Sequence, residues 1–151
     1  MENFAGNIII SLASLPDFLR TPILKKRMVE FFSISEPEKL EVVLNALDAG
    51  PTIPFPNFAK LFKTWLQVIA TLPQGQRDGL FSAYIVQAAR DPEKLIRYNL
   101  DGIFGIFLEI DAEQQKIISE SVARAIMALD SEQQRRIMLL IPDGARIRMG
   151  L

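Results

Sequence analysis

Residues 109–118, EIDAEQQKII, and residues 128–137, ALDSEQQRRI, are near copies of each other. Their aspartates, Asp111 and Asp130, stand nineteen positions apart. Each aspartate is followed three residues later by a glutamine, which is the pattern of a capping box. In that motif the first side chain accepts from the N3 amide and the N3 side chain reaches back to the N-cap amide. The two stretches therefore predict two helix starts nineteen residues apart.

The nineteen-residue spacing continues backwards along the chain. Blocks begin at residues 15, 34, 53, 72, 91, 110 and 129, and positions nine, ten, thirteen, fourteen and seventeen of the blocks are mostly apolar. These five positions share one helical face about 140° wide. Each block therefore predicts one helix of about fourteen residues, roughly 21 Å long, and a tight turn. Extending the register backwards places five further apolar residues on the same face: Phe4, Ala5, Ile8, Ile9 and Leu12.

Two kinds of helix entry open the blocks. Ser35, like Asp111 and Asp130, begins a capping-box pattern. Elsewhere proline takes the second position of the block, where its missing N–H would be unpaired in any case. The prolines and the possible capping hydroxyls upstream of them are Pro16, Pro54, Pro73 and Pro92, and Ser14, Thr52 and Thr71.

Some blocks depart from the pattern. Thr21 and Pro22 predict a delayed helix in the first block, which leaves residues 15–20, LPDFLR, as a turn. Pro142 predicts an early end to the last helix. The fifth block is the least regular, because it carries Gly102 and Gly105 on its expected helix.

The regular blocks predict an all-α chain of seven or eight short antiparallel helices, since short turns make consecutive helices neighbours. Equal lengths favour helix pairs stacked into an α-solenoid, and a compact globular bundle is the alternative. The pairs ISEPEKLEVVLNAL with IPFPNFAKLFKTWLQVIA, and LPQGQRDGLFSAYIVQAAR with DPEKLIRYNLDGIFGIF, resemble the HEAT and armadillo class in length and helix-pair organisation. We expect a single repeat domain over residues 1–151.

Composition excludes several classes of function. The 151 residues include 17 basic and 18 acidic ones, so no global field attracts nucleic acid or an anionic membrane. Cysteine and histidine are absent, which removes thiolate chemistry and the usual proton carrier near neutral pH. There is also no glycine-rich phosphate loop. We expect a cytoplasmic protein that does not insert into membranes, is not an enzyme, and has no catalytic, cofactor-binding or metal-binding residues.

Polar side chains at position six of the blocks form the first candidate partner-binding set. In a paired solenoid, Lys39, Arg77 and Gln115 would line one edge as a ladder of donors suited to an acidic or main-chain ligand. The alternative is that these long side chains run along the core with their polar ends in water.

Aromatic and basic residues form two further sets. Phe55 and Phe58, beside a proline-rich loop, predict an aromatic contact surface, with burial in the core as the alternative. Arg135 and Arg136 concentrate positive charge near the C-terminus, with a solvated face as the alternative.

The sequence thus favours a non-catalytic repeat protein that acts as a protein-binding or scaffold module, with a partner it does not identify. Two alternatives remain open. One is a homo-oligomer assembled through the end helices, because the chain starts in mid-repeat and ends on Met149 and Leu151, so its end surfaces need a cover or a continuation. The other is a carrier of an apolar ligand or lipid in a cavity between helices.

Overall fold

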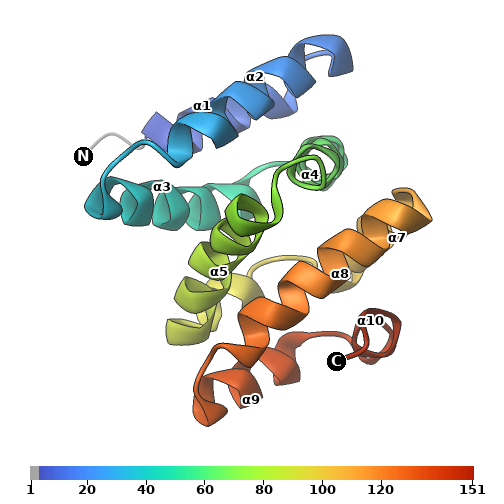
Figure 1. Ribbon diagram of the computed structural model, residues 1–151. Helices are drawn as coiled ribbons and strands as arrows, with labels where there is room; N and C mark the ends of the chain where they lie inside the picture. Colours follow the sequence, from blue (N-terminus) through green and yellow to red (C-terminus); the bar gives the residue numbers. More distant parts are fainter. Residues whose placement is uncertain (1–3) are drawn as a thin grey trace. The chain divides into compact units, whose positions relative to one another are not determined.

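The computed structural model describes residues 4–151, with side chains from Asn7 onward, so the side chains of Phe4 and Ala5 lie outside the described residues. Regular structure in the described range is entirely helical (Figure 1). The elements are α1 (Phe4–Ala13), α2 (Asp17–Phe31), α3 (Glu36–Ala49), the 3₁₀ turn η1 (Gly50–Thr52), α4 (Phe55–Ile69), α5 (Gln74–Arg90), α6 (Glu93–Ile96), α7 (Leu100–Glu109), α8 (Ala112–Met127), α9 (Ser131–Leu140) and α10 (Asp143–Met149).

The helices begin at the interval that the sequence predicts. Seven helices each begin nineteen residues after the one before. They are α2, α3, α4, α5, α6, α8 and α9, and their first residues are 17, 36, 55, 74, 93, 112 and 131. Position seventeen of every block is buried, which confirms the apolar face at that column. Its residues are Phe31, Gly50, Ile69, Ala88, Phe107, Ile126 and Ala145.

The predicted number of seven or eight helices is wrong for two local reasons. In the fifth block the helix that begins at residue 93 stops after one turn, and Asn99 caps a new one by accepting from the Gly102 N–H at 2.9 Å. In the last block Pro142 ends α9 as expected but also begins α10. The described residues therefore contain ten α-helices.

The delayed start predicted for the first block is also wrong. Residues 17–20 lie in the first turn of α2, and Pro22 lies inside the helix. This proline removes only the bond to the carbonyl of Phe18, and Phe18 is exposed. Arg20 is fully buried, and its guanidinium donates to carbonyls preceding α2. The first turn is closed by the backbone N–H groups of Leu19 and Arg20, which donate to the Pro16 carbonyl at 3.1 and 3.0 Å.

The polar side chains beside the turns act in two ways. Ser35 and Asp130 accept from the N–H of the residue three positions on, as predicted. Ser14, Thr52 and Thr71 were expected to cap the helices after them, but each donates to the carbonyl three residues back, at 2.9, 2.6 and 2.6 Å. They therefore satisfy acceptors at the end of the preceding helix.

The chain divides into two compact units, residues 1–71 and 72–151, with the division at the boundary between two blocks. In the first unit α1 packs mainly on α3, and α2 on α4 (Figure 1). In the second unit α5 packs mainly on α8 and then on α9. The closest backbone contacts therefore join helices two or three blocks apart, and consecutive helices are joined chiefly at their turn.

A hydrogen bond from position six holds each of four turns. This position is the fourth residue of its helix, and its side chain donates to the carbonyl of position one, five residues back. The donors and acceptors are Arg20 to Leu15, Arg77 to Leu72 at 2.8 Å, Gln115 to Ile110 at 3.0 Å, and Gln134 to Leu129 at 2.8 Å. We call this contact the turn tether.

The two arginine tethers also reach a second helix within their own unit. Arg20 Nη1 lies 3.5 Å from Thr64 Oγ1 on α4, and Arg77 Nε donates to Ser121 Oγ on α8 at 2.8 Å. Both arginine–hydroxyl pairs span 44 residues. The same repeat positions therefore make the same inter-helix contact in both units.

We predict that Arg20→Met lowers the free energy of unfolding by about 2–4 kcal/mol, because hydrogen bonds to a buried charge are lost and the carbonyls of Leu12 and Leu15 lose their donor. Urea denaturation followed by circular dichroism measures this change. The matched control is Arg27→Met on the same helix, an exposed residue whose replacement should change the free energy by less than about 0.5 kcal/mol. Equal midpoints for wild type and Arg20→Met would refute a stabilising tether.

Candidate functional site

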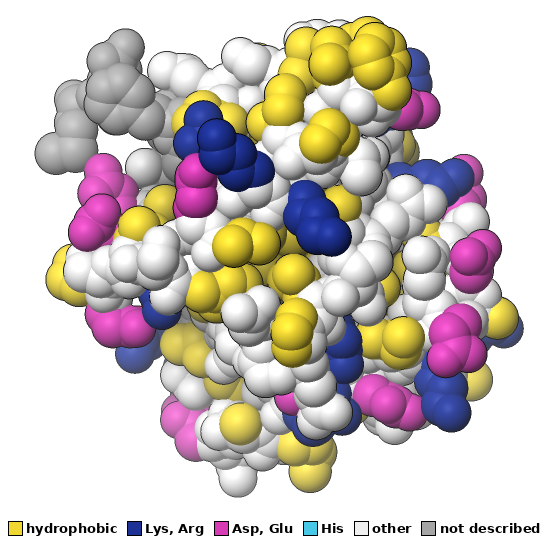
Figure 2. Space-filling view, turned by 45° about the horizontal axis from the view of Figure 1, so that its top comes forward, with side chains coloured by type: hydrophobic (Ala, Val, Ile, Leu, Met, Phe, Trp, Pro, Cys, Tyr) yellow, Lys and Arg dark blue, Asp and Glu magenta, His cyan; other side chains and the backbone are white. Residues whose placement is uncertain are grey.

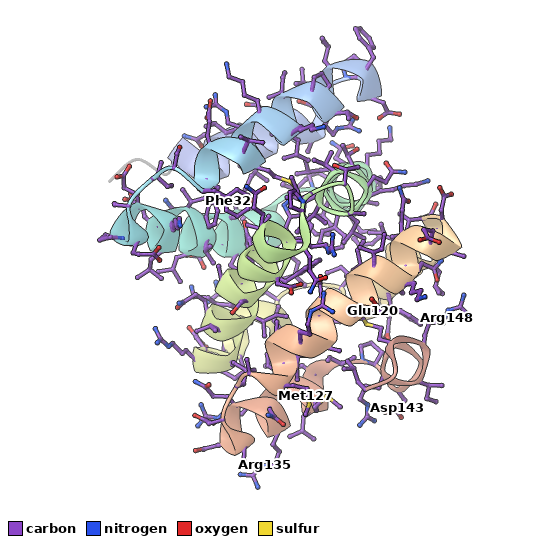
Figure 3. The ribbon with its side chains drawn as sticks, in the orientation of Figure 1. Phe32, Glu120, Met127, Arg135, Asp143 and Arg148 are labelled. Atoms are coloured by element: carbon purple, nitrogen blue, oxygen red, sulfur yellow. The ribbon has the colours of Figure 1, made fainter. Side chains whose placement is uncertain are left out.

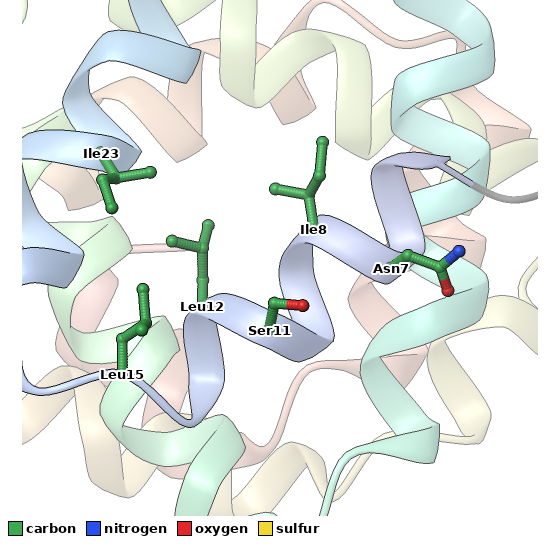
Figure 4. A pocket seen from close by; sticks show the side chains of 6 residues that line it. All are labelled: Asn7, Ile8, Ser11, Leu12, Leu15 and Ile23. Atoms are coloured by element: carbon green, nitrogen blue, oxygen red, sulfur yellow. The ribbon is translucent and has the colours of Figure 1, made fainter.

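A groove open to solvent lies between α1 and α2 in the first unit (Figure 4). It offers about 320 Å³ and has a mostly apolar lining, with exposed Asn7 and Ser11 as its polar members. Such a volume suits a few inserted side chains, since it lies at the lower end for small-molecule pockets. The lining residues are Asn7, Ile8, Ser11, Leu12, Leu15 and Ile23.

The solvent-facing side of α2 continues this apolar surface. Phe18 is 76% exposed and Val29 is 52% exposed. Helical spacing places both on one side of α2 with Pro22, opposite the buried Leu24 and Met28. Figure 2 shows a face of the molecule on which hydrophobic side chains gather beside Lys and Arg side chains. We call the groove together with Phe18, Leu19, Pro22 and Val29 the α1–α2 surface.

Positive charge borders the α1–α2 surface. Lys25, Lys26 and Arg27 are consecutive and exposed on α2. Arg27 is paired with Glu30 at 3.2 Å, and the acidic residue at the start of α2 is paired with Arg20. Lys25 and Lys26 form no ion pair with a described residue, so this border carries uncompensated positive charge.

Ile23 breaks the burial pattern of the repeat. It occupies position nine, which is apolar in six blocks. Four of those residues are at least 94% buried, Val42 is half-buried, and Ile23 is 36% exposed. Among the apolar residues at position nine, Ile23 is therefore the least covered, although residues of α1 lie beside it in the groove. The four buried residues are Leu61, Leu80, Ile118 and Ile137.

The predicted aromatic residues lie on α4. Phe55 is 38% exposed, whereas Phe58 is buried, and their ring centroids are 6.2 Å apart. Phe58 continues a row of rings, with Phe62 at 5.5 Å and then Trp65 another 5.6 Å along. Phe55 is thus the exposed end of this row, and Phe58 belongs to the packed part.

The predicted polar ladder consists of side chains that already have acceptors. Arg77 and Gln115 are turn tethers, and Gln115 also accepts from Arg148 at 3.2 Å. Lys39 is half-buried, bonds to Glu36 at 3.2 Å and lies 5.7 Å from the ring centroid of Phe31. A partner-binding role for the three residues stays a prediction, and it would require them to exchange or share these contacts.

The predicted basic pair lies on α9. Figure 3 shows Arg135 pointing away from the helix, and Arg136 is paired with Glu132 at 2.7 Å. Arg146 and Arg148 on α10 bond to Asp143 and Gln115 respectively. Arg135 is therefore the member of this group whose side chain is most plainly directed to solvent.

Sequence reasoning missed the α1–α2 surface, although two signals for it were present. Arg27 is the one charged residue at position thirteen of the blocks, so the face of α2 could not match that of the other helices. Lys26, three residues after Ile23, adds a second charge beside it, and Lys25 adds one on the other side of α2. A charged interruption of an otherwise constant apolar column indicates a helix with an uncovered side.

A polar network in the second unit is the other feature with chemical potential. Asp78 receives two bonds from Arg124, at 2.8 and 2.9 Å, and one from Ser121 Oγ at 2.6 Å. The hydrogen bond from Arg124 lowers the pKa of Asp78 below its ordinary 3.8, against the raising effect of burial, and Ser121 and Arg77 lower it further. An ionised carboxylate held by two cations is a poor base, so the network joins α5 to α8 without offering a nucleophile–base pair.

The described residues contain neither a metal-binding cluster of the usual kind nor a membrane-spanning helix. Within residues 4–151, no group of three or more acidic, cysteine or histidine side chains is arranged to hold a metal ion. No helix in that range combines the length and the hydropathy needed to cross a bilayer.

We predict that Asp78→Asn lowers the urea midpoint at pH 7, because it removes the charge that holds Arg124 and Ser121. The folded pKa of Asp78 lies below the unfolded value, so its contribution to stability is complete above pH 3.8 and is lost as the pH falls through the folded pKa. The gap between wild type and variant should therefore close as the pH is lowered below 3.8. A gap that is constant from pH 7 to pH 2 would contradict this assignment.

Comparison with known proteins does not suggest a function for this chain. No family model matches the chain, and no curated protein or solved structure is detectably similar to it.

Proposed function

We propose that this chain is a non-catalytic helical-repeat protein that binds another protein through the α1–α2 surface. The observation that carries the proposal is the exposure of Ile23 at a repeat position that is otherwise covered. Exposed apolar side chains with a charged border are typical of a protein-binding surface. Phe18 adds a large exposed aromatic side chain, which is the kind of residue that contributes most to interface energy.

Solenoid-like stacking, in which a helix packs on the helix two blocks away, is part of the proposal. Helix starts at a constant interval support it, as does the repeated arginine–hydroxyl contact in the two units. A solenoid makes the same demand of every repeat, so a missing neighbour on one repeat leaves a ready surface.

We predict that Phe18→Asp combined with Ile23→Asp abolishes capture of the partner, because both changes place a charge on the α1–α2 surface, and circular dichroism checks that the fold is retained. Affinity capture from cells that express the chain, with quantitative mass spectrometry, measures the loss. Ile147→Asp on α10, 81% exposed and in the other unit, is the matched control and should keep the partner. Equal capture by all three proteins would contradict the proposal, as would failure of wild type to enrich any protein.

A homo-oligomer is the second candidate, because the second unit also exposes large apolar side chains. Leu139 on α9 is 80% exposed, Ile147 is 81% exposed, and Met127 at the end of α8, labelled in Figure 3, is 70% exposed. Self-association through the end helices would cover them.

If the end helices assemble, multi-angle light scattering of wild type should show the mass rising with concentration, and Leu139→Asp with Ile147→Asp should return it to that of a monomer. Burial of these side chains would supply the driving force, at about 25 cal/mol per Å² of apolar surface. A constant 17.0 kDa mass for wild type at high concentration would remove this candidate.

A further inference from the structure

We infer that the α1–α2 surface receives an amphipathic α-helix of a partner protein, and that this helix carries acidic residues beside its apolar face. The inference rests on the proposed function and specifies the chemistry of the partner. It has two independent supports: the shape of the uncovered position and the charge around it.

The shape favours a helix because helices of this chain cover the same position elsewhere. Ile118 and Ile137, at position nine of α8 and α9, are 2% and 3% exposed, whereas Ile23 is 36% exposed. The groove beside Ile23 has room for a few side chains, and a helix that fits into a groove supplies them at i, i+3, i+4 and i+7. A partner helix would thus occupy the place that a neighbouring repeat helix occupies in the other blocks.

The charge favours acidic flanks on that helix. Lys25 and Lys26 have no ion-pair partner among the described residues, and the acidic residues of α2 are engaged by Arg20 and Arg27. Helical spacing places Lys26 beside Ile23 and places Lys25 across α2 from Ile23, beside Phe18 and Val29 at the other border of the α1–α2 surface. Acidic side chains beside the apolar face of the incoming helix would meet this border. Basic ones would face like charge, which costs binding energy and excludes such partners.

An anionic membrane would satisfy the lysines but not the groove. A lipid surface is best matched by a convex apolar face, whereas Ile8, Leu12 and Ile23 line a shallow, open groove. The polar side chains of Asn7 and Ser11 also line the groove, and they suit the polar groups of a peptide more than lipid chains. The observations therefore favour a protein helix, and vesicle binding becomes an outcome of the test.

The experiment is selection from a displayed library of 18-residue peptides against the full chain. Each peptide has a helical alanine frame, a leucine, isoleucine, methionine or phenylalanine at four positions of one face, and glutamate, lysine or glutamine in equal proportion at the flanking positions. Selected peptides should be enriched in glutamate over lysine at the flanks. Fluorescence anisotropy of the strongest selected peptide then measures its affinity for the variants.

Ile23→Asp should weaken the peptide at least about tenfold, because it places a charge in the groove. Lys25→Glu with Lys26→Glu should weaken it about three- to tenfold and reduce its dependence on salt. The matched charge reversal, Arg90→Glu with Lys116→Glu, changes two exposed cations of the other unit and should leave the affinity unchanged. Circular dichroism confirms that each variant is folded.

Each other outcome overturns the inference in a recognisable way. Peptides that depend on Ile23 but lack acidic enrichment would refute the acidic helix and leave the proposed function standing. Recovery of no peptide, with flotation of the chain on phosphatidylserine vesicles that Ile23→Asp abolishes, would assign the surface to a membrane. Recovery of no peptide, together with failed capture of any protein, would overturn both proposals.

Discussion

The turn tether is the contact that joins consecutive helices at four of the seven block entrances. A side chain in the first turn of a helix bonds to a carbonyl five residues back, at the entrance of its own block. Gln115 and Gln134 reach further, to carbonyls in the last turn of the preceding helix. Helix ends leave such carbonyls without intrahelical donors. One side chain therefore satisfies the end of one helix and holds the start of the next. Blocks with Phe58 or Ile96 at this position keep the same interval without a side-chain donor, so the tether reinforces the period and does not set it alone.

Much of this fold is predictable because its rules are local. The capping residues Ser35 and Asp130, and the apolar column ending at position seventeen, indicate where helices start and which side they bury. The exceptions depend on distant contacts. Pro22 alone argues for a break, and the bonds of buried Arg20 to Leu12 and Leu15 override it. Asn99 and Pro142 were visible as irregularities, but whether each ends a helix or begins another depends on the packing of the segment that follows.

The candidate site was harder to predict because a sequence shows which groups can bond but not which are already bonded. Arg77 and Gln115 look like donors available to a ligand until the carbonyls within their reach are known. Phe55 and Phe58 differ by one helical turn, and only packing separates the exposed ring from the buried one. Ile23 presents the opposite case, since its apolar column predicts burial and the structure leaves it exposed. In each instance the groups packed around a residue, and not its own type, decide whether its side chain is available to a partner.

The uniformity of the repeat gives exposure at Ile23 a meaning that it would lack in an irregular protein. Single exposed apolar side chains are common on any surface and need no explanation. A repeat, however, makes each helix with the same apolar stripe, and that stripe is stable only when a neighbour covers it. Full burial of an isoleucine side chain is worth about 1.5–3 kcal/mol, so each uncovered stripe position forgoes part of that stabilisation. The 36% exposure of Ile23 therefore marks α2 as the helix whose apolar face is least completely covered at position nine.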